Sequence, residues 1–349
     1  MKIAIVGGPY IPVPPKKYGG TELVIYYLIK GLKEEGHDVI LLGPGDSTVD
    51  CQLISTVSKS IFFPEDPSEL GVFNKRLAKI EAQTKDKLKA IAPKVDIIHS
   101  MGFDLLDFRK FPSLTTLHGP ITFPELGYYL ERKDLNFVSI SKNQQEALPE
   151  LNWMAAVYNG EDPTLFPIIT DPDDYVCFIG RFDREKTPHL AIALAINLGI
   201  KIKLAGKTDF LGYEYFEQEI KPYLKNPLVE YLGEIGFEEK IDLLSKAKCN
   251  LHPTGFREPF GLTVMEAAYC GTPTLAIARG SMPELIKEGL TGMLVEDYVE
   301  GYHQIEQCFS MDRSYIAKRS RSKFNYMNMT RGYLRVYDKV MRQHWLNVD

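Results

Sequence analysis

The stretch YVCFIGRFDREKTPHLAIALAINLGIKIKLAGK, residues 175–207, contains a complete strand–helix–strand pattern. Residues 175–182 (YVCFIGRF) and 200–207 (IKIKLAGK) have the length expected of strands. Between them, residues 189–199 form a longer apolar segment that ends on a glycine, as helices commonly do. The pattern predicts two parallel strands joined by a crossover helix.

The same alternation continues on both sides of this stretch. After it we expect further strands and helices, in the order 229–233, 237–247, 249–253, 261–271 and 272–278. Before it we expect strands at 2–8, 37–43, 95–100, 114–119, 137–141 and 155–160. Helices are expected at 21–36 and 74–92. The fold class is therefore α/β, with two Rossmann-like doubly wound domains that face a central cleft.

The domain boundary is expected in the turn-rich stretch at 158–174. We predict a first Rossmann-like domain at 1–162 and a second at 163–325. The stretch from about 312 to 345 is basic, rich in tyrosine and helical in pattern, and we treat 326–349 as a separate C-terminal helix.

The composition is that of a soluble globular protein: 349 residues, 44% hydrophobic and 25% charged, with a net charge of −5. This charge does not point to nucleic acid. No apolar run is long enough to span a bilayer, and Met1 leads directly into an expected strand, so a cytoplasmic protein without a signal peptide is expected. The five cysteines contain no CxxC pair, which favours reduced thiols.

Several familiar motifs are absent from the sequence. The first strand is followed by GGPYIPVPPKKYGG at 7–20, which lacks the tight GxGxxG turn of a dinucleotide site. No GxxxxGK[ST], HExxH or GxSxG pattern occurs, which excludes a P-loop and argues against a zinc protease or a nucleophile elbow.

Two cations lie close to an expected strand end. In GRFDREK at 180–186, Arg181 follows the strand and Lys186 lies near the start of the next helix. Together they can hold a diphosphate, because Arg offers a bidentate fork and Lys a point charge. An exposed pair at a helix start is an equally good interpretation of these two residues alone.

Weaker candidates lie in the first domain. Gly19 and Gly20 precede the first helix, where glycine lets a ligand approach backbone N–H groups. His118 ends the strand at 114–119 and is expected to face the cleft. On the residues alone, a plain loop-to-helix turn and a structural histidine are the favoured alternatives.

The segment REPFGLTVMEA, 257–267, places Glu258 and Glu266 around a helix start at Gly261. A helix N-terminus favours an anion, and a carboxylate beside a phosphate would repel it. The carboxylates are therefore expected to accept hydrogen bonds from vicinal hydroxyls on either side of a diphosphate, as in a nucleotide sugar. The spacing alone favours a simpler interpretation, a salt-bridged buried Glu266 and a surface Glu258.

Taken together, these segments resemble the retaining, GT-B fold glycosyltransferases of family GT4 (glycosyltransferase group 1). The resemblance covers residues from about 18 to 275, in the family's order, and rests on YGGTE, the HG of TLHGP, NGED, GRFDREK and the E-x7-E motif followed by GTP. It implies transfer of a hexose from a nucleotide-diphosphate sugar, with UDP favoured over GDP. The acceptor would be a hydroxyl of a glycan, a lipid-linked sugar or a small molecule, bound by the first domain.

The resemblance also implies a role for each matching residue. Glu258 would hold hydroxyls of the donor sugar and Glu266 the ribose. Arg181 and Lys186 would neutralise the departing diphosphate, so neither a metal nor another cofactor is expected. The remaining implied site residues are His118 over the donor sugar, Gly19, Gly20, Gly180, Glu234 and Ile235 near the donor, and the backbone of Phe260, Gly261 and Leu262. The C-terminal helix would pack back on the first domain.

The sequence departs from the family pattern at two points. Thr187-Pro188 follows the motif lysine where the family usually has glycine, which we expect only to reset the helix start. The linker reads NGED where a hydrophobic residue is more common before the Asp. No carboxylate nucleophile is evident in the first domain, so the resemblance favours a front-face mechanism in which the leaving diphosphate helps deprotonate the acceptor.

Three alternatives stay open. A sugar-nucleotide epimerase of the same fold would form product without an acceptor, and a non-catalytic nucleotide-sugar-binding protein would bind without turnover. The basic helix at 74–92 could make a weak peripheral membrane contact, although Glu81 and Asp86 favour a solvated face. The loops at 9–18 and 120–130, with the aromatic residues of FPELGYY, are expected to shape the acceptor site.

Overall fold

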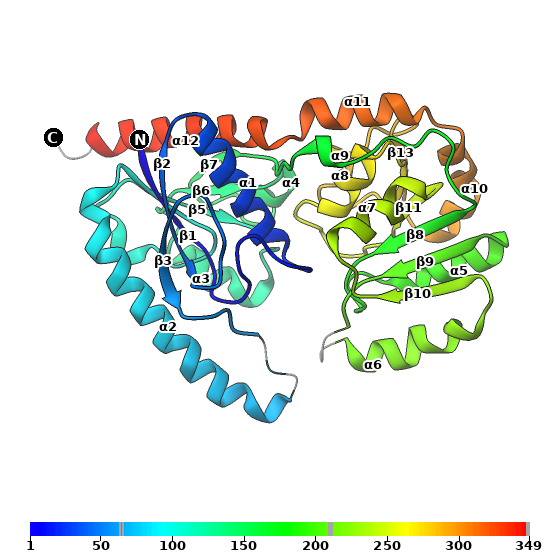
Figure 1. Ribbon diagram of the computed structural model, residues 1–349, viewed down its shortest axis with the longest axis horizontal. Coiled ribbons are helices and arrows are strands. Elements are labelled where there is room, and N and C mark those ends of the chain that lie inside the picture. The colour runs from blue at the N-terminus through cyan, green and yellow to red at the C-terminus, as the bar shows by residue number, and fades with distance from the viewer. Residues whose placement is uncertain (63, 65, 209–211, 347–349) are drawn as a thin grey trace. The chain divides into compact units, whose positions relative to one another are not determined.

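The computed structural model describes residues 1–62, 64, 66–208 and 212–346, and these contain two parallel sheets of seven and six strands. The chain divides into two units (Figure 1): unit 1 combines Met1–Glu161 with the segment from Asn325 onward, and unit 2 is Asp162–Phe324. Each unit has one sheet, so the prediction of two doubly wound α/β domains is confirmed. Residues 347–349, the end of the predicted last helix, lie outside the described residues.

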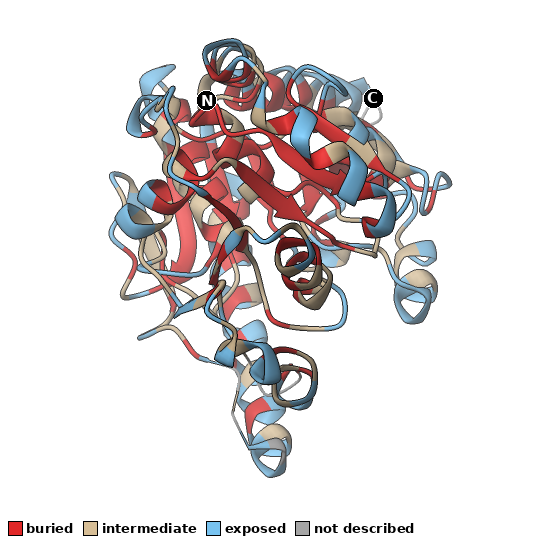
Figure 2. Cartoon of the chain, turned by 90° about the vertical axis from the view of Figure 1, so that its right-hand side faces the viewer, coloured by how far each residue is buried: buried red, intermediate tan, exposed pale blue. Residues whose placement is uncertain are grey.

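The sheet of unit 1 has the strand order β3-β2-β1-β4-β5-β6-β7, all parallel. The strands are β1 Lys2–Val6, β2 Asp38–Pro44, β3 Gln52–Val57, β4 Ile97–Ser100, β5 Ser113–Leu117, β6 Phe137–Ser139 and β7 Trp153–Ala156. All six strands predicted for this part of the chain form, and β3 is an edge strand that the prediction lacks. Strands β4, β5 and β6 are buried along their whole length, and β1 and β2 are exposed only at their first residue, as parallel sheets between helical layers require. Figure 2 shows buried strands in the interior of the molecule and helices with exposed outer faces.

Helices cover both faces of this sheet. They are α1 Gly20–Glu34, α2 Leu70–Ile91, α3 Leu126–Leu130, α4 Lys142–Gln145 and α12 Tyr326–Leu346. On one face Leu88 of α2 packs with Ala4, Val6 and Ile98 of the sheet. Strand residues alternate between faces, so His99 next to Ile98 points the other way, toward α12. Its Nδ1 lies 2.7 Å from the hydroxyl of Tyr337, and burial lowers the pKa of His99 to about 3.

The sheet of unit 2 repeats the same topology, in the order β10-β9-β8-β11-β12-β13. Its strands are β8 Tyr175–Ile179, β9 Lys201–Ala205, β10 Val229–Gly233, β11 Cys249–His252, β12 Thr274–Ile277 and β13 Gly292–Val295. The first five were predicted, and β13 was not. The order reverses between β8 and β11, so the loops after these two neighbouring strands run in opposite directions and leave a crevice where such sheets bind ligands.

The helices of unit 2 are α5 Pro188–Leu198, α6 Tyr213–Tyr215, α7 Phe237–Lys246, α8 Leu262–Tyr269, α9 Met282–Leu285, α10 Tyr298–Phe309 and α11 Arg313–Lys323. Helices α5 and α10 pack on one face, where Ile192, Leu194 and Ile305 join the core. Helix α8 packs against α7 and α11 in the other layer. Within the described ranges, no helix is both long enough and apolar enough to cross a bilayer.

Candidate active site

The loop after β8 holds the predicted cations and is ordered by its own acidic residues. Asp183 accepts hydrogen bonds from the backbone N–H groups of Glu185 and Lys186, at 3.0 and 2.9 Å. Arg181 places Nη1 2.9 Å from Asp183 Oδ2 and Nη2 2.9 Å from Glu185 Oε2, with about a third of its side chain exposed. The guanidinium is therefore held between two carboxylates at the carboxyl end of the strand.

The start of α5 explains the departure from glycine after the motif lysine. Thr187 has φ +45°, in the left-handed region that glycine adopts without strain and other residues adopt at a cost. Its hydroxyl donates to the carbonyl of Pro253 at 2.6 Å, which helps hold this conformation. Pro188 is the first residue of α5, so the helix start is reset as predicted and Lys186 keeps its place before it.

Lys186 and Glu258 meet in a mostly buried ion pair. Lys186 Nζ contacts Glu258 Oε2, and the two side chains are 16% and 14% exposed. His252, the last residue of β11, lies beside them with Nε2 3.9 Å from the same Glu258 oxygen. Burial lowers the pKa of His252 to about 4, with the Lys186 charge acting in the same direction. Glu258 is thus not the surface residue that the spacing alone favours.

Glycine 261 shapes the start of α8. It is the N-cap residue with φ +94°, and a Cβ on it would lie 2.8 Å from Met282 Cε, so only glycine fits without strain. Phe260 before it is buried, and Leu262 after it is the first residue of the helix. The helix N-terminus therefore lies close to Glu258, whose Cγ would be 3.8 Å from that Cβ.

Glu266 is the second carboxylate of the E-x7-E segment and is 1% exposed. Its Oε1 contacts Nζ of Lys240 on α7. Its Oε2 is buried and has no hydrogen-bond partner among the described residues. One oxygen of this carboxylate is therefore neutralised by the protein, and the other is available as an acceptor.

The glycines of unit 1 also lie at a helix start. Gly19 is the N-cap residue of α1 with φ +153°, and Gly20 is the first residue of that helix. A Cβ on Gly19 would lie 2.6 Å from Pro15 Cβ and 3.2 Å from Glu22 Oε2. Burial raises the pKa of Glu22 to about 6, although its backbone hydrogen bond acts in the opposite direction.

Two family models match the chain. Residues 18–157 match Glycosyltransferase Family 4, and residues 167–312 match Glycosyl transferases group 1. The two matches follow one another and together span most of the sequence. The chain belongs to the group 1, family 4 glycosyltransferases.

Known proteins support this assignment along nearly the whole length of the glycosyltransferase. Glycogen synthase of Mycobacterium tuberculosis is 23% identical over an alignment of 345 positions that covers 84% of this chain and 82% of that protein. Sucrose-phosphate synthase of Thermosynechococcus elongatus superposes with a TM-score of 0.77 at 20% identity, covering 98% and 99% of the two chains. Anabaena HepE, solved in complex with UDP and glucose, gives a TM-score of 0.72 at 16% identity over 97% and 100%. These structural similarities confirm the GT-B fold.

The remaining residues that were predicted to bind the nucleotide-sugar donor lie in unit 2. Gly180 follows β8 directly, and its N–H donates to the carbonyl of Ala205 at 3.1 Å. Glu234 and Ile235 lie between β10 and α7, with Glu234 exposed. Lys240 of the following helix α7 contacts Glu266, so α7 links this segment to the E-x7-E segment. No group of three or more potential metal ligands occurs within the part of the chain that the structure describes.

His118 lies in unit 1, one residue past β5. Its Nε2 is 3.3 Å from Met101 Sδ, and burial lowers the pKa of the imidazole to about 4. The ring is therefore neutral at physiological pH. Apart from His118, Gly19 and Gly20, the predicted site residues belong to unit 2.

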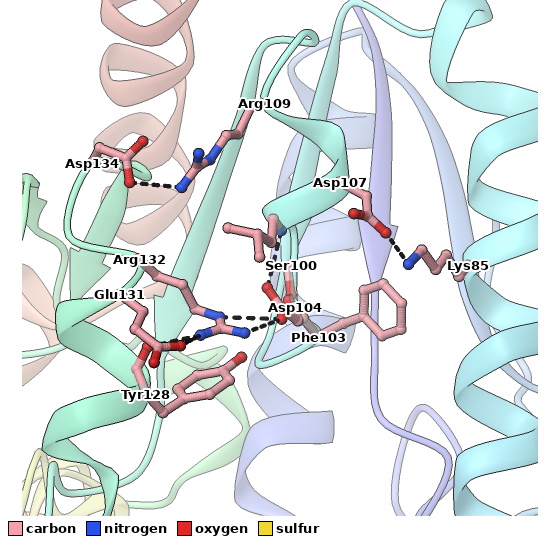
Figure 3. A network of polar contacts seen from close by, with 11 residues as sticks. Lys85, Ser100, Phe103, Asp104, Asp107, Arg109, Tyr128, Glu131, Arg132 and Asp134 are labelled. Atoms are coloured by element: carbon pink, nitrogen blue, oxygen red, sulfur yellow. Dashed lines mark hydrogen bonds and ion pairs between the residues drawn. The ribbon is translucent and has the colours of Figure 1, made fainter.

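A polar network joins the segments after β4 and β5 of the glycosyltransferase (Figure 3). Arg132 donates through Nε and Nη2 to Asp104 Oδ2, at 3.1 and 2.8 Å, and its guanidinium lies 3.8 Å from the centroid of the Tyr128 ring. One face of Tyr128 is thus covered, whereas Phe123 in the same 120–130 segment is 87% exposed. Burial raises the pKa of Asp104, but the hydrogen bonds from Arg132 and the backbone outweigh it and the net pKa is lowered.

Four polar residues of the site were not predicted: Asp183, Glu185, Lys240 and His252. The first two stand inside the quoted GRFDREK segment, so their positions between the two cations were visible. His252 ends the strand at 249–253, the same signal that selected His118. Lys240 could not be predicted from the sequence, because no motif links a lysine of α7 to Glu266, which lies 26 residues later.

Proposed function

We propose that the chain is a retaining, metal-independent hexosyltransferase that uses a UDP-sugar as its donor. The observation that carries the proposal is the ion pair between Lys186 and Glu258 at the switch point of unit 2. Arg181 follows β8, and the N-terminus of α8 follows the neighbouring strand β11, so both lie at the same edge of the sheet. Cations and a helix N-terminus suit a diphosphate, and carboxylates suit sugar hydroxyls.

In the free protein the side chains of both Arg181 and Lys186 form ion pairs with carboxylates of the protein. Arg181 is held by Asp183 and Glu185, and Lys186 by Glu258. A bound diphosphate would take over these cations, because it carries more charge than a single carboxylate and accepts several hydrogen bonds. Glu258 would then be free to accept hydrogen bonds from the hydroxyls of the donor sugar.

The ribose would be held by Glu266. Its Oε1 is fixed by Lys240, and its buried Oε2 lacks a partner among the described residues, as expected for an oxygen that awaits a hydroxyl. Glu234 and Ile235 would lie near the base. For His118, Gly19 and Gly20 of unit 1 we propose the roles that the family resemblance implies.

The chemistry would proceed on the front face of the sugar. The departing diphosphate, stabilised by Arg181 and Lys186, helps deprotonate the acceptor hydroxyl, and the positively charged sugar is stabilised by the negative charge around it. Fixed cations replace the metal that many transferases use to neutralise the leaving group. The acceptor would be a hydroxyl of a glycan, a lipid-linked sugar or a small molecule. We also propose a cytoplasmic location, which five free cysteines support.

The donor is tested by calorimetric titration of the purified protein with UDP, GDP and ADP, with and without EDTA. We expect UDP to bind, with the same affinity when EDTA is present. Tighter binding of GDP or ADP would replace UDP as the donor nucleotide, and a loss of binding in EDTA would contradict metal independence. Binding of none of the three would contradict the donor site.

The stereochemistry is tested by following the anomeric proton of the transferred sugar by NMR. An α-linked donor such as UDP-glucose should give an α-linked product. A β-linked product would exclude retention. Conversion of the donor to an epimer without any acceptor would replace the transferase by an epimerase, and UDP binding without turnover over a broad acceptor panel would favour a non-catalytic binding protein.

A further inference from the structure

His252 is a buried histidine whose position on the backbone is fixed. It ends β11, pairs in parallel register with Ala276 of β12, and its side chain is 6% exposed. Its Nε2 is buried and has no hydrogen-bond partner in the described part of the chain. Buried polar groups are normally paired, so an unpaired ring nitrogen at this place calls for an explanation.

The neighbour of this nitrogen is the carboxylate of Glu258. Nε2 lies 3.9 Å from Oε2, about 1 Å beyond hydrogen-bond distance. Glu258 Oε2 is already in contact with Lys186 Nζ. In the free protein, therefore, Lys186 satisfies the carboxylate and His252 stands next to it without a bond.

A bound donor changes this balance. Under the proposed function, on which this step depends, the diphosphate draws Lys186 away from Glu258. The carboxylate would then remain in a site where its side chain is 14% exposed, without the cation that neutralises it. Leaving a buried carboxylate without a partner is costly, so another hydrogen-bond donor of the protein has to replace the ammonium group of Lys186.

We infer that His252 is the positioning residue that replaces Lys186 on Glu258 when a diphosphate binds. The Nε2–H group then donates to Oε2 and holds the other carboxylate oxygen toward the hydroxyls of the sugar. A shift of about 1 Å by either side chain closes the distance. His252 itself does not touch the donor; it acts through Glu258.

The charged groups around the imidazole determine in which direction the pKa of His252 changes when Lys186 leaves Glu258. They are Lys186, from the loop before α5, and Glu258, from the loop after β11. Tyr298 of α10 contacts the backbone of His252. Burial and Lys186 lower the pKa of His252 to about 4, while Glu258 raises it. When the diphosphate neutralises Lys186 and Glu258 becomes the nearest partner, the pKa of His252 must rise.

The first test follows the imidazole resonances of the whole protein by NMR as UDP or inorganic diphosphate is added. We expect the pKa of His252 to rise by about one unit or more. The resonances of His303, an exposed histidine of α10 in the same unit, serve as the reference and should not move. Calorimetry in parallel establishes that the ligand is bound.

The second test separates positioning from packing. His252→Phe keeps the ring shape but has no N–H donor, whereas His252→Gln keeps a donor. UDP release from UDP-glucose should fall about 10- to 100-fold in kcat for His252→Phe, the range for a hydrogen bond to a charged group, and His252→Gln should recover most of it. The affinity for UDP should stay within about threefold, because the imidazole does not touch the nucleotide. His303→Gln is the matched control.

The outcomes distinguish the inference from the function beneath it. Bound UDP with an unchanged His252 titration, or a His252→Phe variant with the kcat of the wild type, overturns the positioning role and leaves the donor site intact. A kcat equally low in His252→Gln and His252→Phe, with lower thermal stability in both, also overturns it, because packing then explains the loss. Absence of UDP and diphosphate binding overturns both.

Discussion

Two lysine–glutamate pairs of unit 2 look alike in composition and differ in their surroundings. Lys240–Glu266 joins two helices, α7 and α8, and the glutamate side chain is 2% exposed. Lys186–Glu258 joins two loops, the glutamate side chain is 14% exposed, and His252 lies 3.9 Å away. Among the described residues, His252 is a second possible donor near the contact oxygen of Glu258, and no such donor lies near the contact oxygen of Glu266.

This difference indicates what each pair is for. Release of Lys240 would leave Glu266, whose side chain is 2% exposed, as an uncompensated buried charge, so this pair is expected to stay fixed. A pair on loops, with a spare donor beside it, can release its lysine to a ligand. The two glutamates of one E-x7-E segment should therefore differ in their response to mutation: loss of Glu258 should lower mainly turnover, whereas loss of Glu266 should lower both UDP affinity and stability.

The largest effect is expected for Glu258→Ala. The sugar loses its carboxylate, and turnover of UDP-glucose should fall roughly 10³-fold, as for removal of one preorganised group at a reaction centre. UDP itself should bind as well as before or more tightly, because Lys186 no longer has an internal competitor. Turnover within tenfold of the wild type would contradict the role of Glu258.

Lys186→Met is expected to act on binding. The affinity for UDP should fall about 100-fold, in the range for loss of one partner of a buried charge pair. The free energy of unfolding should change by only about 1 kcal/mol, because His252 is close enough to take over Glu258. Calorimetry and urea unfolding measure the two quantities. A loss of stability as large as that of Lys240→Met would remove the distinction between the pairs.

Lys240→Met is expected to act on stability. Glu266 would be left as an uncompensated buried charge, and the free energy of unfolding should fall by about 3 kcal/mol. The double variant Lys240→Met with Glu266→Met should recover much of the loss, which a double-mutant cycle measures. Lys246→Met is the matched control, since Lys246 lies on the same helix in an exposed pair with Asp242. Equal unfolding curves for the two single lysine variants would contradict the structural role of the Lys240–Glu266 pair.

Glu22 of unit 1 is a buried carboxylate that, unlike Glu258 and Glu266, has no ion-pair partner among the described residues. Burial raises its pKa to about 6 from 4.5, so the folded state holds this proton more tightly than the unfolded state. Its contribution to stability is complete below pH 4.5 and is lost as the pH rises through 6. Glu22→Gln should therefore gain about 1–2 kcal/mol over the wild type between pH 4 and pH 7.5. A difference that does not change with pH in urea unfolding would exclude this titration.

Much of the fold could be predicted because apolar strands in parallel sheets leave a clear pattern. Apart from Lys2 and Arg181, the runs at 2–8 and 175–182 are apolar, and they form β1 and β8, which are almost wholly buried. β3, Gln52–Val57, was missed because it is an edge strand. Its residues are mostly half-buried and include Gln, Ser and Thr, so the sequence lacks the apolar run that indicates a buried strand. β13, Gly292–Val295, was missed because its apolar run is only Met293–Val295, between a glycine and the acidic residues Glu296 and Asp297.

The sequence selected candidate residues, whose role at a donor site stays a prediction, but it did not indicate which of them are in contact. Arg181, Lys186, Glu258 and Glu266 were visible as a spacing along the chain, and the contacts of the two lysines with the two glutamates were not. These contacts depend on which loops the sheet order brings together. The reversal of strand order between β8 and β11 places GRFDREK beside E-x7-E, and a sequence pattern does not contain that order.

Helix α12 has a consequence for the synthesis of this protein. It is the last helix, yet its Tyr337 contacts His99 in the first sheet, and the bridge between Glu161 and Asn325 marks where the chain leaves unit 1 and returns. A ribosome therefore releases every strand of unit 1 before unit 2 exists, but the helix that covers one face comes out only after unit 2 is finished. At about 5–20 residues per second, that face waits for on the order of ten seconds. The part translated first is completed last, and the nascent chain needs protection from aggregation during this interval.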